Sequence, residues 1–409
     1  MNFPNELLDY VGRADHAYQW KLAGGDGKNL FELELVSQQW QGIVWRHRLQ
    51  VFIPDEIRYR ELGVLSIRSS AGGESETQEG HALAHGTGMV WAYLHHVPNQ
   101  PLFQDLIEDA LIAHTLVQYL DTEDPSWPLL FPMVKSAARA LDAIQELLHK
   151  QGRAVPARFV ATGASKRGWT SWLLPVVDSR LAGIIPVVYD NLNLIAQMPH
   201  QVEVWGDYSE QIGDYTRHGL QQKMSTERGR RLTAILDPYS YRSALALPKL
   251  IVNGANDRYW ATDALNLYWE NLEGPKSVLY NPNEGHSFSS MGRFYQAGAA
   301  FLRAVAEGRS LPPVRGSFST RDGIMELLIS TDAPTLSAHI WTAESPTSDF
   351  RMSVWKETAL SRSSEENGWA GKVSLPTDCS FAAFGEVLFE GEGENFSLST
   401  PPFLVKHKI

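Results

Sequence analysis

The feature that most limits how this chain can fold is an alternation of short apolar runs with helical patterns, beginning near residue 60. The runs are apolar at successive positions, which is typical of strands buried on both faces. The alternation predicts a mostly parallel α/β sheet flanked by helices. The expected strands are 62–67, 88–94, 159–162, 183–189, 249–253 and 277–280, and the expected helices are 105–120, 134–148, 166–177 and 262–272.

Two regions of the first 310 residues depart from this alternation. Residues 31–36 and 43–53 alternate apolar and polar side chains, which predicts antiparallel strands that extend the sheet. Between two of the core strands, residues 195–248 are far longer than an ordinary connection. We interpret this segment as a helical cap, and we expect its Trp205 and Tyr208 to contribute to substrate binding.

The pattern changes after Leu311-Pro-Pro313, where helical signals disappear. Short strand-like segments separated by turn residues predict a β-sandwich of the immunoglobulin or fibronectin III kind. These segments are 325–330, 336–341, 350–355, 369–375 and 385–389. We therefore predict an α/β domain over residues 1–310, with the strand extension and the cap, and a β-sandwich domain over 311–409.

Composition narrows the classes of function. The chain has 36 Lys and Arg against 47 Asp and Glu, a net charge of −11, which argues against a nucleic-acid or anionic-membrane partner. A single cysteine, Cys379, excludes an internal disulfide framework. The first residues do not resemble a signal peptide, and no apolar run is long enough to cross a membrane. We expect a soluble, cytoplasmic protein, or a secreted or periplasmic one if a leader has been removed. The oligomeric state is not indicated.

Four histidines lie close together in the sequence, at His81, His85, His95 and His96. Cysteine or acidic ligands at a matching spacing are missing around them, so we predict no metal site and no cofactor there.

The most informative stretch is Phe159–Trp169, where an apolar strand runs into Gly163-Ala-Ser165 and a helix begins at once. A strand, a sharp turn and a helix are the context of a nucleophile elbow. The stretch departs from the common Gly-x-Ser-x-Gly form, because Arg167 stands two places after the serine and Gly168 follows it. The structural alternative is a serine that only caps the helix.

An activated serine needs donors for the oxyanion that forms when it attacks a carbonyl. The backbone amide of Lys166 lies at the start of the expected helix and is the natural first donor. We expect the second donor in the loop after strand 62–67, near Ala71.

The serine also needs a base and an acid, which follow it along the chain in the order serine, acid, histidine in α/β-hydrolases. Asp257 follows the strand at 249–253, and His286 follows the strand at 277–280. We assign Asp257 as the acid and His286 as the base, with Asp190 as an alternative acid. Each residue taken alone is more often a structural turn or loop residue.

Arg167 has two interpretations. With Lys166, it favours a substrate that bears a carboxylate, because a guanidinium binds a carboxylate through two parallel bonds. The structural alternative is an ion pair with an acidic side chain, such as Asp178, Asp190 or Glu284.

The elbow sequence Gly163-Ala-Ser-Lys-Arg-Gly-Trp169 resembles the signature of the PhoPQ-activated pathogenicity-related proteins, the PqaA-like family. The resemblance spans nearly the whole chain and implies an α/β-hydrolase-like fold with a serine nucleophile at Ser165. Asp257 and His286 match the family's Asn-Asp and Gly-His segments. The other matching segments are Val97-Pro-Asn-Gln-Pro-Leu102, Glu108-Asp-Ala-Leu-Ile-Ala113, Pro132-Met-Val-Lys135, Asp237-Pro-Tyr-Ser-Tyr241, Pro248-Lys-Leu-Ile251 and Asp349-Phe-Arg351.

A shorter likeness links the elbow to glucuronoyl esterases, in which a basic residue follows the serine as Lys166 does here. We therefore predict a serine hydrolase that acts on an ester or amide of a small molecule or peptide, without a cofactor. One alternative is a non-catalytic secreted, signalling or virulence-related binding protein on a hydrolase scaffold. Another is a peptidase of the prolyl-oligopeptidase kind, although its extra β domain usually precedes the catalytic one.

Overall fold

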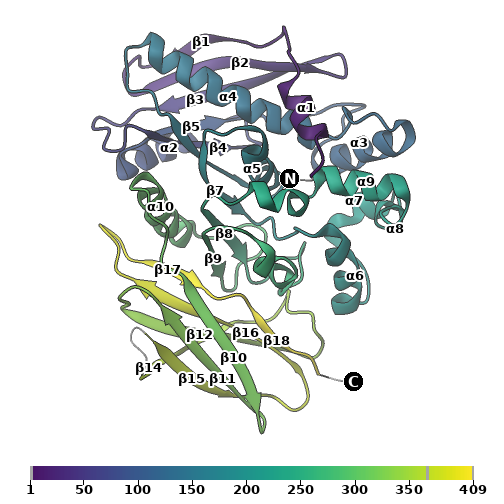
Figure 1. The fold of residues 1–409 in the computed structure, drawn as a ribbon, viewed down its shortest axis with the longest axis vertical. Helices are drawn as coiled ribbons and strands as arrows, with labels where there is room; N and C mark the ends of the chain where they lie inside the picture. The colour runs from purple at the N-terminus through teal and green to yellow at the C-terminus, as the bar shows by residue number, and fades with distance from the viewer. Residues whose placement is uncertain (1–2, 365–367, 408–409) are drawn as a thin grey trace. The chain divides into compact units, whose positions relative to one another are not determined.

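The computed structural model describes residues 3–364 and 368–407 (Figure 1). The chain divides into two compact units. The first unit runs to Tyr189 and includes Asp214–Leu247, and the second comprises Asp190–Gly213 and the chain from Pro248 onward.

The first unit contains a mixed sheet in the order β1-β2-β3-β5-β4-β6-β7. Strands β1, β2 and β3 pair antiparallel, β3 pairs antiparallel with β5, and the other pairs are parallel. Strands β4 and β5 are buried along their whole length, as their continuous apolar runs predict. The strands are β1 (Gln19–Gly25), β2 (Leu30–Trp40), β3 (Ile43–Phe52), β4 (Leu62–Ile67), β5 (Val90–Leu94), β6 (Arg158–Ala164) and β7 (Leu181–Val187).

Helices cover this sheet (Figure 1). Helix α4 packs against β2, α2 packs against β3 and β5, and α5 packs against β6 and β7. The helical elements that lie wholly in this unit are α1 (Glu6–Gly12), α2 (Glu74–Thr87), α3 (Glu108–Thr122), α4 (Leu130–Lys150), α5 (Lys166–Val177), α8 (Leu220–Lys223), α9 (Glu227–Leu236) and the 3₁₀ helix η2 (Pro238–Ala244). The predicted helix at 166–177 is confirmed to the residue.

In the second unit, β8 (Lys249–Gly254) pairs parallel with β9 (Lys276–Asn281). The remaining elements before the C-terminal strands are α6 (Leu194–Trp205), η1 (Glu210–Ile212), η3 (Ala264–Leu267), η4 (Trp269–Asn271) and α10 (Gly292–Ala306), and α7 (Gly213–Thr216) begins at the last residue of one segment of this unit. The prediction of one helix over 262–272 is wrong. Two short 3₁₀ helices form instead, and Lys276 Nζ bonds the carbonyls of Trp269 and Leu272 at their end.

The C-terminal strands form two antiparallel layers (Figure 1). One layer has the order β17-β16-β12-β13, with β18 also on β16, and the other has the order β10-β11-β15-β14. A Cβ atom at Gly385 of β16 would lie 2.5 Å from Ile329 of β11, so the layers pack face to face. The strands are β10 (Val314–Arg321), β11 (Ile324–Thr331), β12 (Ser337–Ser345), β13 (Lys356–Ala359), β14 (Ser361–Arg362), β15 (Trp369–Ser374), β16 (Ser380–Phe389), β17 (Phe396–Ser399) and β18 (Phe403–Val405).

This arrangement confirms the predicted α/β class with a C-terminal antiparallel β region. Strand β17 also pairs with β9, so these strands continue the sheet of β8 and β9. A domain boundary at residue 311 stays a prediction. The strand predicted at 350–355 is wrong: these residues form a turn, which the Ser353 amide closes by donating to the Phe350 carbonyl at 3.1 Å.

Candidate active site

Ser165 lies on a strained turn between β6 and α5. Its backbone angles are φ 57° and ψ −122°, which a residue other than glycine rarely adopts. An ordinary helix N-cap has extended backbone angles with negative φ, so these angles favour a nucleophile elbow over a simple cap. The Ser165 amide donates to the Val187 carbonyl at 2.8 Å, which fixes the turn against the end of β7.

Two glycines make this turn possible. A Cβ atom at Gly163 would lie 2.7 Å from the backbone of Arg167, and one at Gly168 would lie 3.0 Å from the Val187 carbonyl oxygen. Gly168 therefore takes the role of the second glycine of the Gly-x-Ser-x-Gly motif, in which helix and strand backbones lie close together, although it stands one position later. The side chain of Arg167 is directed to the Val97 carbonyl and the Glu108 carboxylate.

The two cationic residues after the serine are buried and paired with carboxylates of α3. Arg167 donates to both carboxylate oxygens of Glu108, at 2.9 and 2.6 Å, and to the Val97 carbonyl at 2.5 Å. Lys166 Nζ lies 3.0 Å from Glu108 and 3.0 Å from Asp109. The structural partner of Arg167 is therefore Glu108, so the prediction of Asp178, Asp190 or Glu284 as its partner is wrong.

This pairing controls the charge of Glu108. Burial raises the pKa of its carboxyl, but the hydrogen bonds and charge of Arg167, together with Lys166, outweigh burial and lower it to about 2. The guanidinium of Arg167 is already paired with the Glu108 carboxylate through two hydrogen bonds. Its predicted role in binding a substrate carboxylate stays a prediction.

The loop that we expect to supply the second oxyanion donor starts at the same sheet edge as the elbow, since Ile67 lies opposite Gly163 in the parallel register. Arg48 holds this loop by donating to the carbonyls of Ala71 and Gly72, at 3.2 and 2.8 Å. The amides of Ala71 and Lys166 stay predicted oxyanion donors.

The four clustered histidines belong to two segments, helix α2 and the residues directly after β5. His81 and His85 lie on α2. His95 is buried, and its ring nitrogens contact Gln50 at 2.9 Å and Ser70 at 3.2 Å. Burial lowers the pKa of His95 to about 4. Among residues 3–364 and 368–407, no group of three or more His, Cys, Asp or Glu side chains is arranged to hold a metal ion.

The predicted acid and base are hydrogen-bonded in the second unit. His286 Nδ1 lies 2.8 Å from Asp257 Oδ2, while Asp257 Oδ1 accepts from the Tyr259 amide at 2.8 Å. A carboxylate accepts hydrogen bonds, so His286 Nδ1 is the donor in this bond. The Tyr259 ring lies 4.0 Å from the His286 ring, centroid to centroid, and limits its rotation. This is the orientation that a general base needs.

Asp190, the alternative acid, lies in a buried polar cluster. It accepts hydrogen bonds from Tyr268 at 2.6 Å, Asn253 at 2.8 Å and Tyr280 at 3.3 Å. Burial, with a smaller contribution from the charge of Asp257, raises its pKa to about 7. The carboxylate that is hydrogen-bonded to His286 is that of Asp257, not Asp190. Asp190 lies beside a cavity of about 10 Å³, which holds at most one water molecule.

The two aromatic residues expected to bind substrate lie at the end of α6 and just after it. The guanidinium of Arg351 lies 4.3 Å from the centre of the Trp205 ring, and Tyr208 is half-buried. Their role in substrate binding stays a prediction.

The predicted site residues fall into two groups, and the members of each group belong to the same unit. Ser165, Lys166 and the 68–73 loop belong to the first unit, and Asp257 and His286 belong to the second. Sequence reasoning missed the ion pairs of Glu108 and Asp109 with the residues after the serine. Their one signal was the Glu108-Asp-Ala segment of the family resemblance.

Comparisons with known proteins agree with this fold. Residues 7–351 match the model of the family described as PhoPQ-activated pathogenicity-related protein. Autocrine proliferation repressor protein A of Dictyostelium discoideum is 33% identical over 310 residues, which cover 70% of this chain and 62% of that protein. The match therefore spans less than two thirds of the relative's length.

Among solved structures, acetyl xylan esterase 1 from Thermoanaerobacterium sp. JW/SL YS485 is similar, with a TM-score of 0.51 and 13% identity. The alignment covers 74% of this chain and 94% of the esterase. This similarity shows the α/β-hydrolase fold. Of the helices in the described part of the chain, none has the length and apolar character needed to span a bilayer.

Proposed function

Because the chain belongs to the PhoPQ-activated pathogenicity-related protein family and has an α/β-hydrolase fold, we propose that it is a serine hydrolase that cleaves an ester or an amide. The observation that carries this proposal is the 2.8 Å hydrogen bond between His286 and Asp257. It fixes the orientation of the imidazole, so that Nε2 is the nitrogen that would take the serine proton in the proposed reaction. The strained turn at Ser165 supports the proposal, because such strain exposes a nucleophile at the end of a strand.

In the proposed reaction, Ser165 Oγ attacks the substrate carbonyl carbon while His286 Nε2 takes the hydroxyl proton. The carbonyl oxygen becomes an oxyanion that the amides of Lys166 and Ala71 stabilise. Asp257 holds the imidazolium in place through its hydrogen bond to Nδ1. His286 then gives its proton to the leaving alcohol or amine, and the acyl group remains on Ser165.

Water completes the cycle through the same groups. His286 removes a proton from water as its oxygen attacks the acyl carbon, and it returns that proton to Ser165 Oγ when the acid product leaves. The scheme uses the chain's own residues, and its substrate is a small-molecule or peptide ester or amide.

The test is labelling by a fluorophosphonate probe, which reacts covalently with activated serines. We expect the native protein to be labelled and the Ser165→Ala and His286→Ala variants to lose labelling, with thermal melting as the check that each is folded. Labelling that survives in Ser165→Ala would identify a different nucleophile. Hydrolysis of p-nitrophenyl acetate compared with release of an amine from a peptide anilide would then separate an esterase from a peptidase.

A second candidate is a non-catalytic signalling protein on a hydrolase scaffold. It is favoured by one observation, the name of the Dictyostelium relative, which describes a repressor of proliferation. Absence of probe labelling in the folded native protein would favour this second function over the hydrolase.

A further inference from the structure

We propose that the turn at 349–355 in the C-terminal β region positions the acid and the base of the catalytic site, with Asn256 and Asn283 as the positioning residues. This inference rests on the proposed function, since it concerns the same Asp257–His286 pair. It assigns a role to a part of the chain that lies almost 100 residues beyond Asp257 in sequence.

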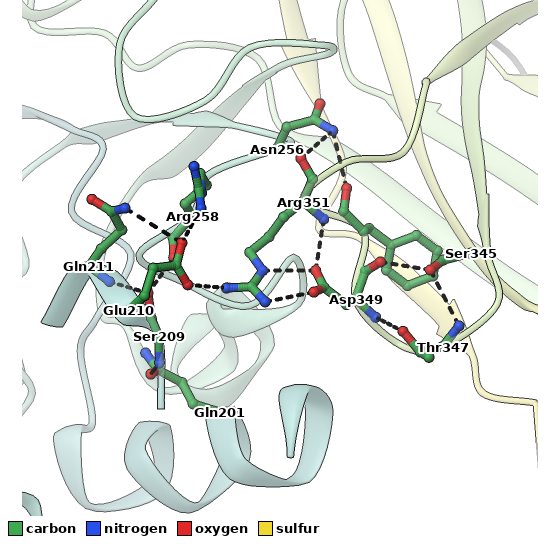
Figure 2. A network of polar contacts seen from close by, with 11 residues as sticks. Gln201, Ser209, Glu210, Gln211, Asn256, Arg258, Ser345, Thr347, Asp349 and Arg351 are labelled. Carbon is green, nitrogen blue, oxygen red and sulfur yellow. Dashed lines mark hydrogen bonds and ion pairs between the residues drawn. The ribbon is translucent and has the colours of Figure 1, made fainter. Parts of the chain in front are cut away.

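The first contact is made by Asn256, the residue before the catalytic acid. Its side-chain nitrogen donates toward the carbonyls of Ser353 at 2.7 Å, Phe350 at 3.1 Å and Arg351 at 3.4 Å. Figure 2 shows Asn256 beside Arg351. These carbonyls lie close to one another because a backbone hydrogen bond, donated by the Ser353 amide to the Phe350 carbonyl, closes the turn. The backbone just before Asp257 is therefore held by the turn.

The second contact is made by Arg258, the residue after the acid. Arg258 pairs with Glu210, and the same carboxylate accepts from Arg351 at 2.8 Å. Arg351 also makes two bonds to Asp349, at 2.9 and 2.6 Å, and lies between the two acids in Figure 2. Asn256 and Arg258 thus connect to the same turn by separate routes, which fixes the backbone on both sides of Asp257.

The loop that carries the base is tied to the same turn. Asn283 donates to the Trp355 carbonyl at 3.0 Å and accepts from the Trp355 amide at 2.8 Å. The acid and base loops also touch directly, because the Asn256 amide donates to the Glu284 carbonyl at 2.9 Å. A Cβ atom at Gly254 would lie 2.1 Å from the Gly285 carbonyl oxygen, so only glycine permits this approach.

These contacts are suited to orientation more than to overall stability. The carboxylate of Glu210 is 47% exposed, and exposed ion pairs contribute little to the free energy of unfolding. A shift of about 1 Å in a catalytic group, by contrast, costs roughly 100-fold in rate. Losing the turn contacts is therefore expected to lower the rate of the chemical step in a protein that still folds.

The test uses Asn256→Ala, Asn283→Ala and Arg351→Ala, with Arg315→Ala as the matched control. Arg315 also makes two bonds to an aspartate of the C-terminal region, Asp332, at 2.6 and 3.0 Å, but it is not part of the turn. Two quantities are measured on the full chain: the rate of fluorophosphonate labelling, and the NMR resonance of the proton on His286 Nδ1, assigned by its loss in His286→Gln. Thermal melting identifies any variant that does not fold.

We expect labelling to slow by roughly tenfold to 100-fold in the turn variants, with the His286 proton resonance shifted or broadened, and both to be unchanged in Arg315→Ala. Folded turn variants with the native labelling rate and the native resonance would overturn the proposal. The resonance also separates this proposal from the hydrolase proposal. If the native protein is not labelled but the resonance still moves in the turn variants, the positioning role stands and the hydrolase function fails.

Discussion

Replacing the buried Asp190 with asparagine should remove a pH-dependent loss of stability. The Asp190 side chain is only 4% exposed, and burial raises its pKa from 3.8 to about 7. Between these values the folded chain keeps the proton while the unfolded chain releases it. The folded state is therefore favoured at low pH, and its stability falls as the pH rises from about 4 to 7.

The size of this effect follows from the pKa difference. The interval from 3.8 to about 7, at 1.36 kcal/mol per pH unit, corresponds to about 4 kcal/mol of stability lost by the native protein. Asparagine has nearly the same shape and stays neutral. Its amide faces Asn253, whose buried Oδ1 has no hydrogen-bond partner among the described residues and can accept after a flip of that amide. The D190N variant should therefore gain stability relative to the native protein as the pH rises.

The assay is urea unfolding of both proteins at intervals from pH 4.5 to 8.5, followed by tryptophan fluorescence. The quantity of interest is the difference in unfolding free energy between variant and native protein at each pH. Asp332→Asn is the control, because Asp332 is exposed and its ion pair with Arg315 contributes little. A difference that is flat with pH, or that falls as the pH rises, would refute the reasoning. Probe labelling of D190N should stay near the native rate, since His286 is bonded to Asp257.

Three further predictions concern other parts of the chain. Glu108→Gln should lower the free energy of unfolding by about 1–3 kcal/mol at pH 7. The loss is smaller than the pKa of about 2 alone would give, because the Glu108 side chain is one-third exposed. Urea unfolding should show that the loss disappears as the pH falls below 4.5. Gly163→Ala should destabilise by about 1–3 kcal/mol because its Cβ meets backbone, whereas Gly86→Ala in open space on α2 should be neutral or stabilising, and a melting curve that ranks them the other way would contradict the elbow geometry. The hydrogen bond to Asp263 raises the pKa of His200, so the stabilisation is complete below pH 6.5 and is lost as the pH rises through the raised pKa. His200→Gln should therefore be less stable than native at pH 5.5 by roughly 1–2 kcal/mol and closer to native at pH 9, and a gap in melting temperature that widens with pH would count against it.

Local sequence patterns predicted the core of the fold because each core element is contiguous. An apolar run followed by a helical pattern predicts a buried strand followed by a helix that packs on the sheet. The helix predicted at 166–177 is confirmed to the residue. Helix α2 was missed because its sequence, ESETQEGHALAHGT, has few apolar residues. The segment 350–355 alternates like a strand but forms a turn, since its carbonyls bind a side chain of another loop.

Some contacts could not be read from the chain at all. Glu108 and Arg167 are 59 residues apart, and no local rule connects them. The turn that holds Asn256 is almost 100 residues away. Such pairs form because strands and helices bring distant segments together, and hydropathy patterns carry no information about which polar side chains will then meet.

The sequence by itself determined the strand–turn–helix at Ser165 and the α/β class with a β region after it, and it predicted the order serine, acid, histidine. These depend on contiguous patterns and on the chemistry of single residue types. Only the tertiary structure decided which carboxylate holds His286. The parallel register of β8 and β9 sets Gly254 opposite Asn281, so Asp257 and His286 leave the sheet at one edge, while Asp190 is enclosed by Tyr268, Asn253 and Tyr280. Burial and distance separate the two aspartates, and both are properties of the folded chain.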